Sequence, residues 1–100
     1  TAFWVTPVIA LVSPGFELAP NADEVQDVFE VPLSFLMNPA NHRRHQFDWQ
    51  GQQRQWFSMP YQQDRLGPNG QSEAVERFIW GATAAMLRNF YRFLVVNPVQ

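Results

Sequence analysis

The stretch HRRHQFDWQGQQRQWFSMPY, residues 42–61, decides the fold because it carries the clearest strand signal in the sequence. Toward the end of its first arm, 42–49, ring-bearing side chains alternate with polar ones, which is the period of a half-buried strand. The dipeptide Gln50-Gly51 follows as a turn, and the second arm runs over 53–61. The stretch therefore predicts a β-hairpin.

Three apolar segments before the hairpin predict further strands. Residues 3–12 are apolar almost throughout and partly β-branched, which is typical of a strand buried on both faces. A proline-glycine turn separates them from a short strand over 16–19, and a third strand is predicted over 25–31. Residues 32–37, with proline in the first turn, predict a short helix.

The segments after the hairpin predict a loop, a strand and a closing helix. The run Gly67-Pro68-Asn69-Gly70 marks 62–74 as a loop. Residues 75–80 predict a short strand, and 83–95 show an apolar stripe at helical spacing. This order of elements predicts an α+β fold, a mixed sheet with few helices to cover it. The stripe comprises Met86, Leu87, Phe90, Tyr91, Leu94 and Val95, and Arg88, Asn89 and Arg92 lie opposite it.

Composition bounds the functional classes. The 100 residues make one small domain at most, and 46% hydrophobic against 16% charged residues indicates a globular chain. Cysteine and lysine are absent, which excludes disulfides, thiolate chemistry and a Schiff-base lysine. A net charge of −2 with scattered arginines argues against nucleic acid as a partner. With no apolar run near the roughly 18 residues of a membrane span and no signal-peptide pattern, we expect a cytoplasmic protein without a membrane partner.

Few side chains form a recognisable site. His42 and His45 flank two arginines, but strand parity puts them on opposite faces, so a polar strand edge is a better interpretation than a metal site. None of the four serines has a convincing histidine–acid arrangement around it. The tryptophans are interpreted as core residues rather than as platforms for a base; they are Trp4, Trp49, Trp56 and Trp80.

Three sequence segments occur in order along the chain: FWVTPVIALV at 3–12, PNADEVQDVFEVPLSFLMNPANHRR at 20–44 and RFIWGATAAMLRNFYRFL at 77–94. Together they resemble the downstream half of Nudix (MutT-like) hydrolases of the coenzyme A pyrophosphatase type. The resemblance covers nearly the whole chain apart from 62–74. It implies that residues 1–100 are the C-terminal portion of a single Nudix domain, a partial Nudix fold from an α/β/α sandwich.

The resemblance also implies metal chemistry whose main ligands are missing here. The Nudix box, G-x5-E-x7-R-E-U-x-E-E-x-G-U, and the coenzyme A motif before it occur nowhere in the sequence, and both would lie upstream of Thr1. In the family the box glutamates hold Mg²⁺ or Mn²⁺. We therefore expect the complete enzyme to use one of these ions, and the chain alone to bind none and to be inactive.

One acid of this chain is a candidate for the chemistry. Many Nudix enzymes place an acidic residue six positions before the residue that precedes V-P-L. Here Glu30 precedes that tripeptide, so the resemblance makes Glu24 the candidate catalytic and metal-linked residue. The alternative interpretation of Glu24 is a solvated loop acid. Asp27 and Glu30 are expected to be strand-face acids with arginine partners.

The parent protein is thus expected to be a Nudix pyrophosphohydrolase acting on coenzyme A or a related small nucleotide. The alternative is a non-catalytic interaction or structural module that retains half of a Nudix sheet. Because the strand predicted over 3–12 would lack its cover and a pairing partner, we expect a homodimer or larger assembly joined through it.

Overall fold

The computed structural model describes residues 4–96, which belong to two compact units, Thr1–Glu30 and Val31–Gln100. Every helix and strand of the described residues lies in the second unit, in the order α1, η1, β1, β2, β3, α2. A sheet combined with helices along one chain is an α+β arrangement. The predicted fold class is confirmed.

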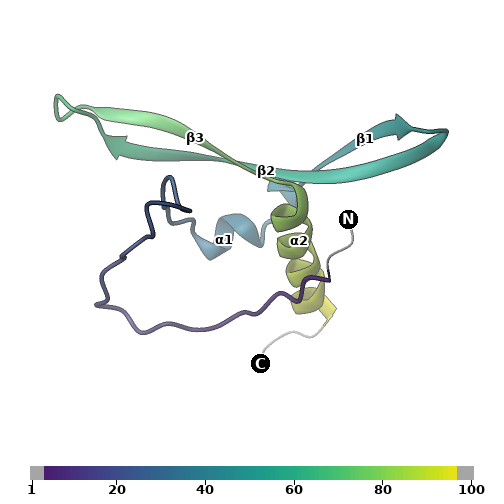
Figure 1. Ribbon diagram of the computed structural model, residues 1–100, viewed down its shortest axis with the longest axis horizontal. Coiled ribbons are helices and arrows are strands. Elements are labelled where there is room, and N and C mark those ends of the chain that lie inside the picture. The colour runs from purple at the N-terminus through teal and green to yellow at the C-terminus, as the bar shows by residue number, and fades with distance from the viewer. Residues whose placement is uncertain (1–3, 97–100) are drawn as a thin grey trace. The chain divides into compact units, whose positions relative to one another are not determined.

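The hairpin predicted from the sequence forms the first part of a three-stranded antiparallel sheet (Figure 1). Strand β1 spans Arg43–Trp49 and pairs with β2, Gln52–Leu66. The turn between them has φ of 48° at Gln50 and 74° at Gly51. Positive φ at both positions suits the right-handed twist of the two strands, and glycine tolerates it without steric cost.

The loop predicted over 62–74 is wrong for most of its length. Strand β2 continues to Leu66, and β3, Ser72–Trp80, begins soon after and pairs with it. Only a tight connection remains, in which the Gly67 N–H donates to the Gln71 carbonyl at 2.7 Å. This segment is polar because it forms a long, solvent-exposed two-stranded ribbon. Composition alone does not distinguish such a ribbon from a loop.

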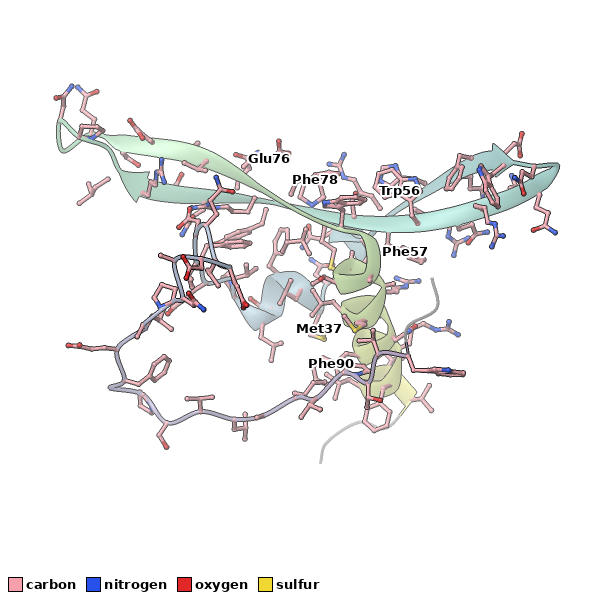
Figure 2. The ribbon with its side chains drawn as sticks, viewed as in Figure 1. Met37, Trp56, Phe57, Glu76, Phe78 and Phe90 are labelled. Atoms are coloured by element: carbon pink, nitrogen blue, oxygen red, sulfur yellow. The ribbon has the colours of Figure 1, made fainter. Side chains whose placement is uncertain are left out.

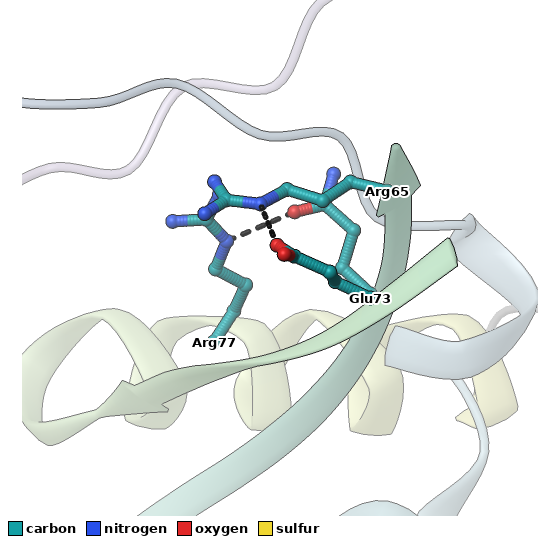
Figure 3. Close-up of polar contacts among 4 residues, drawn as sticks. Arg65, Glu73 and Arg77 are labelled. Carbon is teal, nitrogen blue, oxygen red and sulfur yellow. Dashed lines mark hydrogen bonds and ion pairs between the residues drawn. The ribbon is translucent and has the colours of Figure 1, made fainter. Parts of the chain in front are cut away.

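One ion pair and one hydrogen bond join β2 to β3 near the far end of that ribbon (Figure 3). The Nε of Arg65 lies 3.9 Å from the Oε2 of Glu73, and Arg77 donates from Nε to the Gln63 side-chain oxygen at 2.9 Å. Each contact joins β2 to β3 between side chains on the same face of the sheet. Exposed cross-strand pairs of this kind contribute about 0.2–1 kcal/mol each.

Two short helical elements precede the sheet in the sequence, and one longer helix follows it. Helix α1, Leu33–Leu36, starts after Pro32, and η1, Pro39–Asn41, is capped by the Asn38 side chain, which accepts from the Ala40 N–H at 3.0 Å. The short helix α1 agrees with the helix predicted over 32–37. Helix α2, Gly81–Val96, follows β3 directly, and the φ of 66° at Gly81 allows the abrupt change of direction.

Residues 4–30 contain no strand, so the strands predicted there are wrong over the described residues. Phe3, the first residue of the predicted 3–12 strand, lies outside the described residues. Trp4 and Leu11 are fully exposed rather than buried. A strand needs a neighbour to take up its backbone hydrogen bonds. The apolar pattern indicated which residues could be buried, but not which segment would pair with them.

Both α-helices lie on one face of the sheet, and no helix among the described residues of this unit covers the opposite face (Figure 1). In Figure 2, Phe57 points toward the helices, whereas Trp56, Phe78 and Glu76 point away from them. Among residues 4–96 only Ser58, Met59 and Ala84 are fully buried. Trp49, Trp80 and Trp4 are 52%, 61% and 101% exposed, so the prediction that they are core residues is wrong.

Met59 is the largest buried side chain and sets the stability of this small core. Met59→Ala is expected to lower the free energy of unfolding by about 2–4 kcal/mol, because the helices cannot collapse fully into the cavity. The matched variant Phe78→Ala, on the uncovered face and 49% exposed, should cost less than half as much. Urea unfolding followed by circular dichroism compares the two. Equal losses would mean that the face carrying Phe78 is covered in solution.

Candidate functional site

The sequence-predicted acid, Glu24, lies in the first unit on a tight turn built by Asn21. The Asn21 carbonyl accepts from the N–H groups of Glu24 and Val25, at 3.0 and 2.7 Å, and its side-chain oxygen accepts from the Asp23 N–H at 3.0 Å. An asparagine that bonds its own backbone in this way is a common turn former. The turn holds the backbone of Glu24 and leaves its side chain exposed to solvent.

An apolar hollow adjoins this turn within the same unit. Its lining includes Val25, the residue after Glu24, together with Leu18, Ala19, Pro20 and Val28. Glu24 is thus an exposed acid that is adjacent in sequence to a residue lining an apolar surface. The arrangement therefore permits a functional role for Glu24.

The two other acids of this segment do not occupy the strand predicted for them. Asp27 accepts the Val28 N–H through Oδ1 at 2.8 Å, and Glu30 is exposed at the end of the first unit. The prediction that Asp27 and Glu30 are strand-face acids is wrong, because residues 25–31 form no strand.

In the second unit a polar cluster joins the start of the hairpin to α2. The Nε2 of His42 lies 2.6 Å from the Leu36 carbonyl oxygen, and its Nδ1 lies 3.1 Å from Nη1 of Arg88. A carbonyl only accepts and a guanidinium only donates, so Nε2 carries the proton and Nδ1 is the acceptor. His42 is thereby a neutral imidazole with both ring nitrogens engaged.

Aromatic rings surround the guanidinium of Arg88. Its central carbon lies 5.5 Å from the ring centre of Tyr91 and 5.9 Å from that of Phe57. Tyr91 also meets the His42 ring edge-on at 5.3 Å. Arg88 is half-buried, and these cation–π contacts stabilise its charge there.

The second histidine contacts a serine. The Nε2 of His45 lies 2.7 Å from Oγ of Ser58, and its ring stacks on Trp56 with centres 3.8 Å apart. Ser58 thus has a histidine partner that the sequence analysis did not identify. Because Ser58 is fully buried, its hydroxyl is closed to a substrate, and the contact stabilises the pairing of β1 with β2.

The described residues do not fit a divalent metal site on their own. Within 4–96, no group of three or more histidine, aspartate or glutamate side chains is placed to hold an ion. Both nitrogens of His42 are occupied, and His45 contacts Ser58 instead. If Glu24 contacts a metal, the remaining ligands must come from outside these residues.

Comparison with known proteins decides the family. The chain is 32% identical to an uncharacterised Nudix hydrolase NudL of Photorhabdus laumondii, over 85% of this chain and 38% of that protein. It is 33% identical to a NudL of Enterobacter sp. strain 638, over 98% of this chain and 44% of the relative. The mouse peroxisomal coenzyme A diphosphatase NUDT7 is 34% identical over 65% of this chain and 28% of its own length.

The chain belongs to the Nudix hydrolase family. It spans less than half the length of these curated relatives. No family model and no solved structure matches it. The resemblance to Nudix hydrolases that the three sequence segments indicated is therefore confirmed at the level of the family.

Arg88 is the residue of this Nudix segment that sequence reasoning placed incorrectly. It was predicted on the solvent side of the closing helix, but it is half-buried and bonded to His42. A signal was present, since Arg88 precedes Tyr91 by three positions and residues three apart share a helix face. The apolar stripe and this arginine thus lie against the same partners.

Replacing Arg88 tests whether the cluster fastens α2 to the hairpin. Arg88→Met is expected to cost about 1–2 kcal/mol of folding free energy, because His42 loses a charged donor and two rings lose their cation. Nitrogen-15 spectra of His42 should show a fixed Nε2–H tautomer that becomes mixed in the variant. Arg92→Met, on the same helix but exposed, is the matched control. If Arg88→Met and Arg92→Met had the same effect on the His42 tautomer and on the free energy of unfolding, the cluster would have no structural role.

Proposed function

We propose that residues 1–100 are the C-terminal portion of a single Nudix domain in a metal-dependent hydrolase. Its substrate is coenzyme A or a related nucleoside diphosphate derivative, cleaved at the diphosphate. The observation that carries this proposal is the 34% identity to a coenzyme A diphosphatase within a set of relatives that are all Nudix hydrolases. Cleavage of coenzyme A at this bond yields 3′,5′-ADP and a phosphopantetheine.

Glu24 is the residue of this chain that we assign to the chemistry. Its side chain is exposed and it precedes Val25, which lines the apolar hollow, so its carboxylate can approach a bound substrate without first leaving an ion pair or a buried position. A carboxylate with that freedom suits acid–base catalysis or a link to a metal. The hollow offers an apolar wall against which an organic part of the substrate can rest.

The metal of the complete enzyme is proposed to be Mg²⁺ or Mn²⁺. Hard divalent ions select oxygen ligands, and the glutamates of a Nudix box outside this chain provide them. Residues 4–96 contain no helix long and apolar enough to cross a bilayer.

A second candidate function is favoured by the uncovered sheet face. Phe47, Trp49, Phe78 and Trp80 are each about half exposed or more, and exposed aromatic surface of this kind marks an association site. A non-catalytic interaction module with half of a Nudix sheet would present such a face permanently. In an enzyme, the same face is covered by the rest of the domain.

One experiment separates the two functions. The complete protein that contains this chain is incubated with coenzyme A and Mn²⁺, and release of 3′,5′-ADP is followed by chromatography, with excess chelator as the control. Chelator-sensitive release supports the hydrolase. Absence of turnover on coenzyme A and on nucleoside diphosphate derivatives, by a folded protein, would support the interaction module instead.

A further inference from the structure

Among the described residues, strand β1 is an edge of the three-stranded sheet and has a partner on one side only. In a hairpin closed by a two-residue turn, the residues flanking the turn exchange both of their backbone hydrogen bonds. These residues are Trp49 and Gln52. Alternation along the strand then directs the backbone N–H and C=O groups of Arg44, Gln46 and Asp48 away from β2. This edge is free to accept another strand.

The charged side chains of the same edge have no ionic partner. Among the described residues, no hydrogen bond or ion pair reaches Asp48, and Arg44 contacts only the Phe57 ring, at 5.8 Å. The opposite edge of the sheet differs, because Glu73 and Arg77 on β3 already contact Arg65 and Gln63. Charges of both signs without an ionic partner therefore lie on β1, whereas on β3 only Glu76 is without one among the described residues.

The sequence of β1 is complementary to itself when two copies run antiparallel about Gln46. Arg44 of each copy then lies opposite Asp48 of the other, on the face that also carries Phe57. On the uncovered face, Arg43 meets Trp49 and His45 meets Phe47. Sliding one strand by two residues removes both ion pairs, because Arg44 or Asp48 then faces a glutamine. One register is thus selected by charge.

We propose that β1 is a homodimer interface, in which the edges of two copies of this chain pair antiparallel about Gln46 into one continuous sheet. Pairing satisfies the outward backbone groups and places the exposed Phe47 and Trp49, 47% and 52% accessible, beside rings and cations of the second copy. An isologous contact of this type closes after two copies.

Charge reversal and charge exchange test this interface by sedimentation of the hundred-residue chain. Asp48→Arg and Arg44→Asp each place like charges opposite one another twice, and each is expected to weaken the dimer about tenfold to a hundredfold. The double variant Arg44→Asp/Asp48→Arg restores opposite charges in the same register and should return the dissociation constant to within about threefold of the original. Asp64→Arg changes the net charge equally on β2, away from β1, and should have no effect.

Amide hydrogen exchange provides a second measurement that does not depend on the variants. In the dimer, the N–H groups of Arg44, Gln46 and Asp48 should be protected at high protein concentration and exchange at least tenfold faster on dilution, whereas that of Trp49 stays protected throughout. A chain that is monomeric at high concentration, or a dimer in which these three amides exchange freely, would overturn the proposal. So would a double variant as weak as the single ones.

Discussion

The hundred-residue chain by itself is expected to release no 3′,5′-ADP from coenzyme A in the presence of Mg²⁺ or Mn²⁺. Residues 4–96 contain no cluster of three or more side chains that could hold such an ion, and the sequence lacks a Nudix box. A catalytic metal contributes several kcal/mol of transition-state stabilisation. Each 1.36 kcal/mol is tenfold in rate, so the chain should be slower than the complete protein by at least roughly a thousandfold.

Chromatographic assay of both preparations at equal concentration measures this ratio. The complete protein serves as the positive control, and heat-treated chain gives the background. Turnover by the chain at a rate comparable to the complete protein, from material free of longer species, would show that catalysis does not require the box.

Glu24→Gln in the complete protein is expected to lower kcat by at least about tenfold. Glutamine keeps the shape of the side chain but can neither take up a proton nor bring a negative charge to a metal, and a positioned acid–base group contributes on this scale or above it. The backbone of residue 24 is held by the Asn21 carbonyl, so the fold should be retained. Steady-state kinetics and circular dichroism together measure the effect.

Glu30→Gln is the matched control for this prediction. It is also an exposed acid of the first unit, six residues further along, and it is not among the residues that line the apolar hollow. Its substitution should change kcat by less than about twofold. If the two variants behave alike, the assignment of Glu24 from the six-residue spacing before V-P-L is incorrect.

The sequence alone determined the elements whose signals are local. Alternation in 42–49 and a turn at Gln50-Gly51 were sufficient for the hairpin, because strand period and turn geometry depend on near neighbours. Helical spacing identified α2, and the proline in the first turn identified α1. The sequence segments that resemble Nudix hydrolases identified the family and pointed to Glu24.

The tertiary structure decided which segments are paired and which faces are covered. The strands predicted within 4–30 pair with no segment among the described residues, whereas the polar residues at 62–66 are a strand because β3 lies alongside. Arg88 reads as a solvent-facing residue, yet it binds His42 from a position 46 residues further along the chain. In each case the outcome depends on whether a partner segment is present, and a local pattern records the propensity to pair or to be buried without recording the partner that satisfies it.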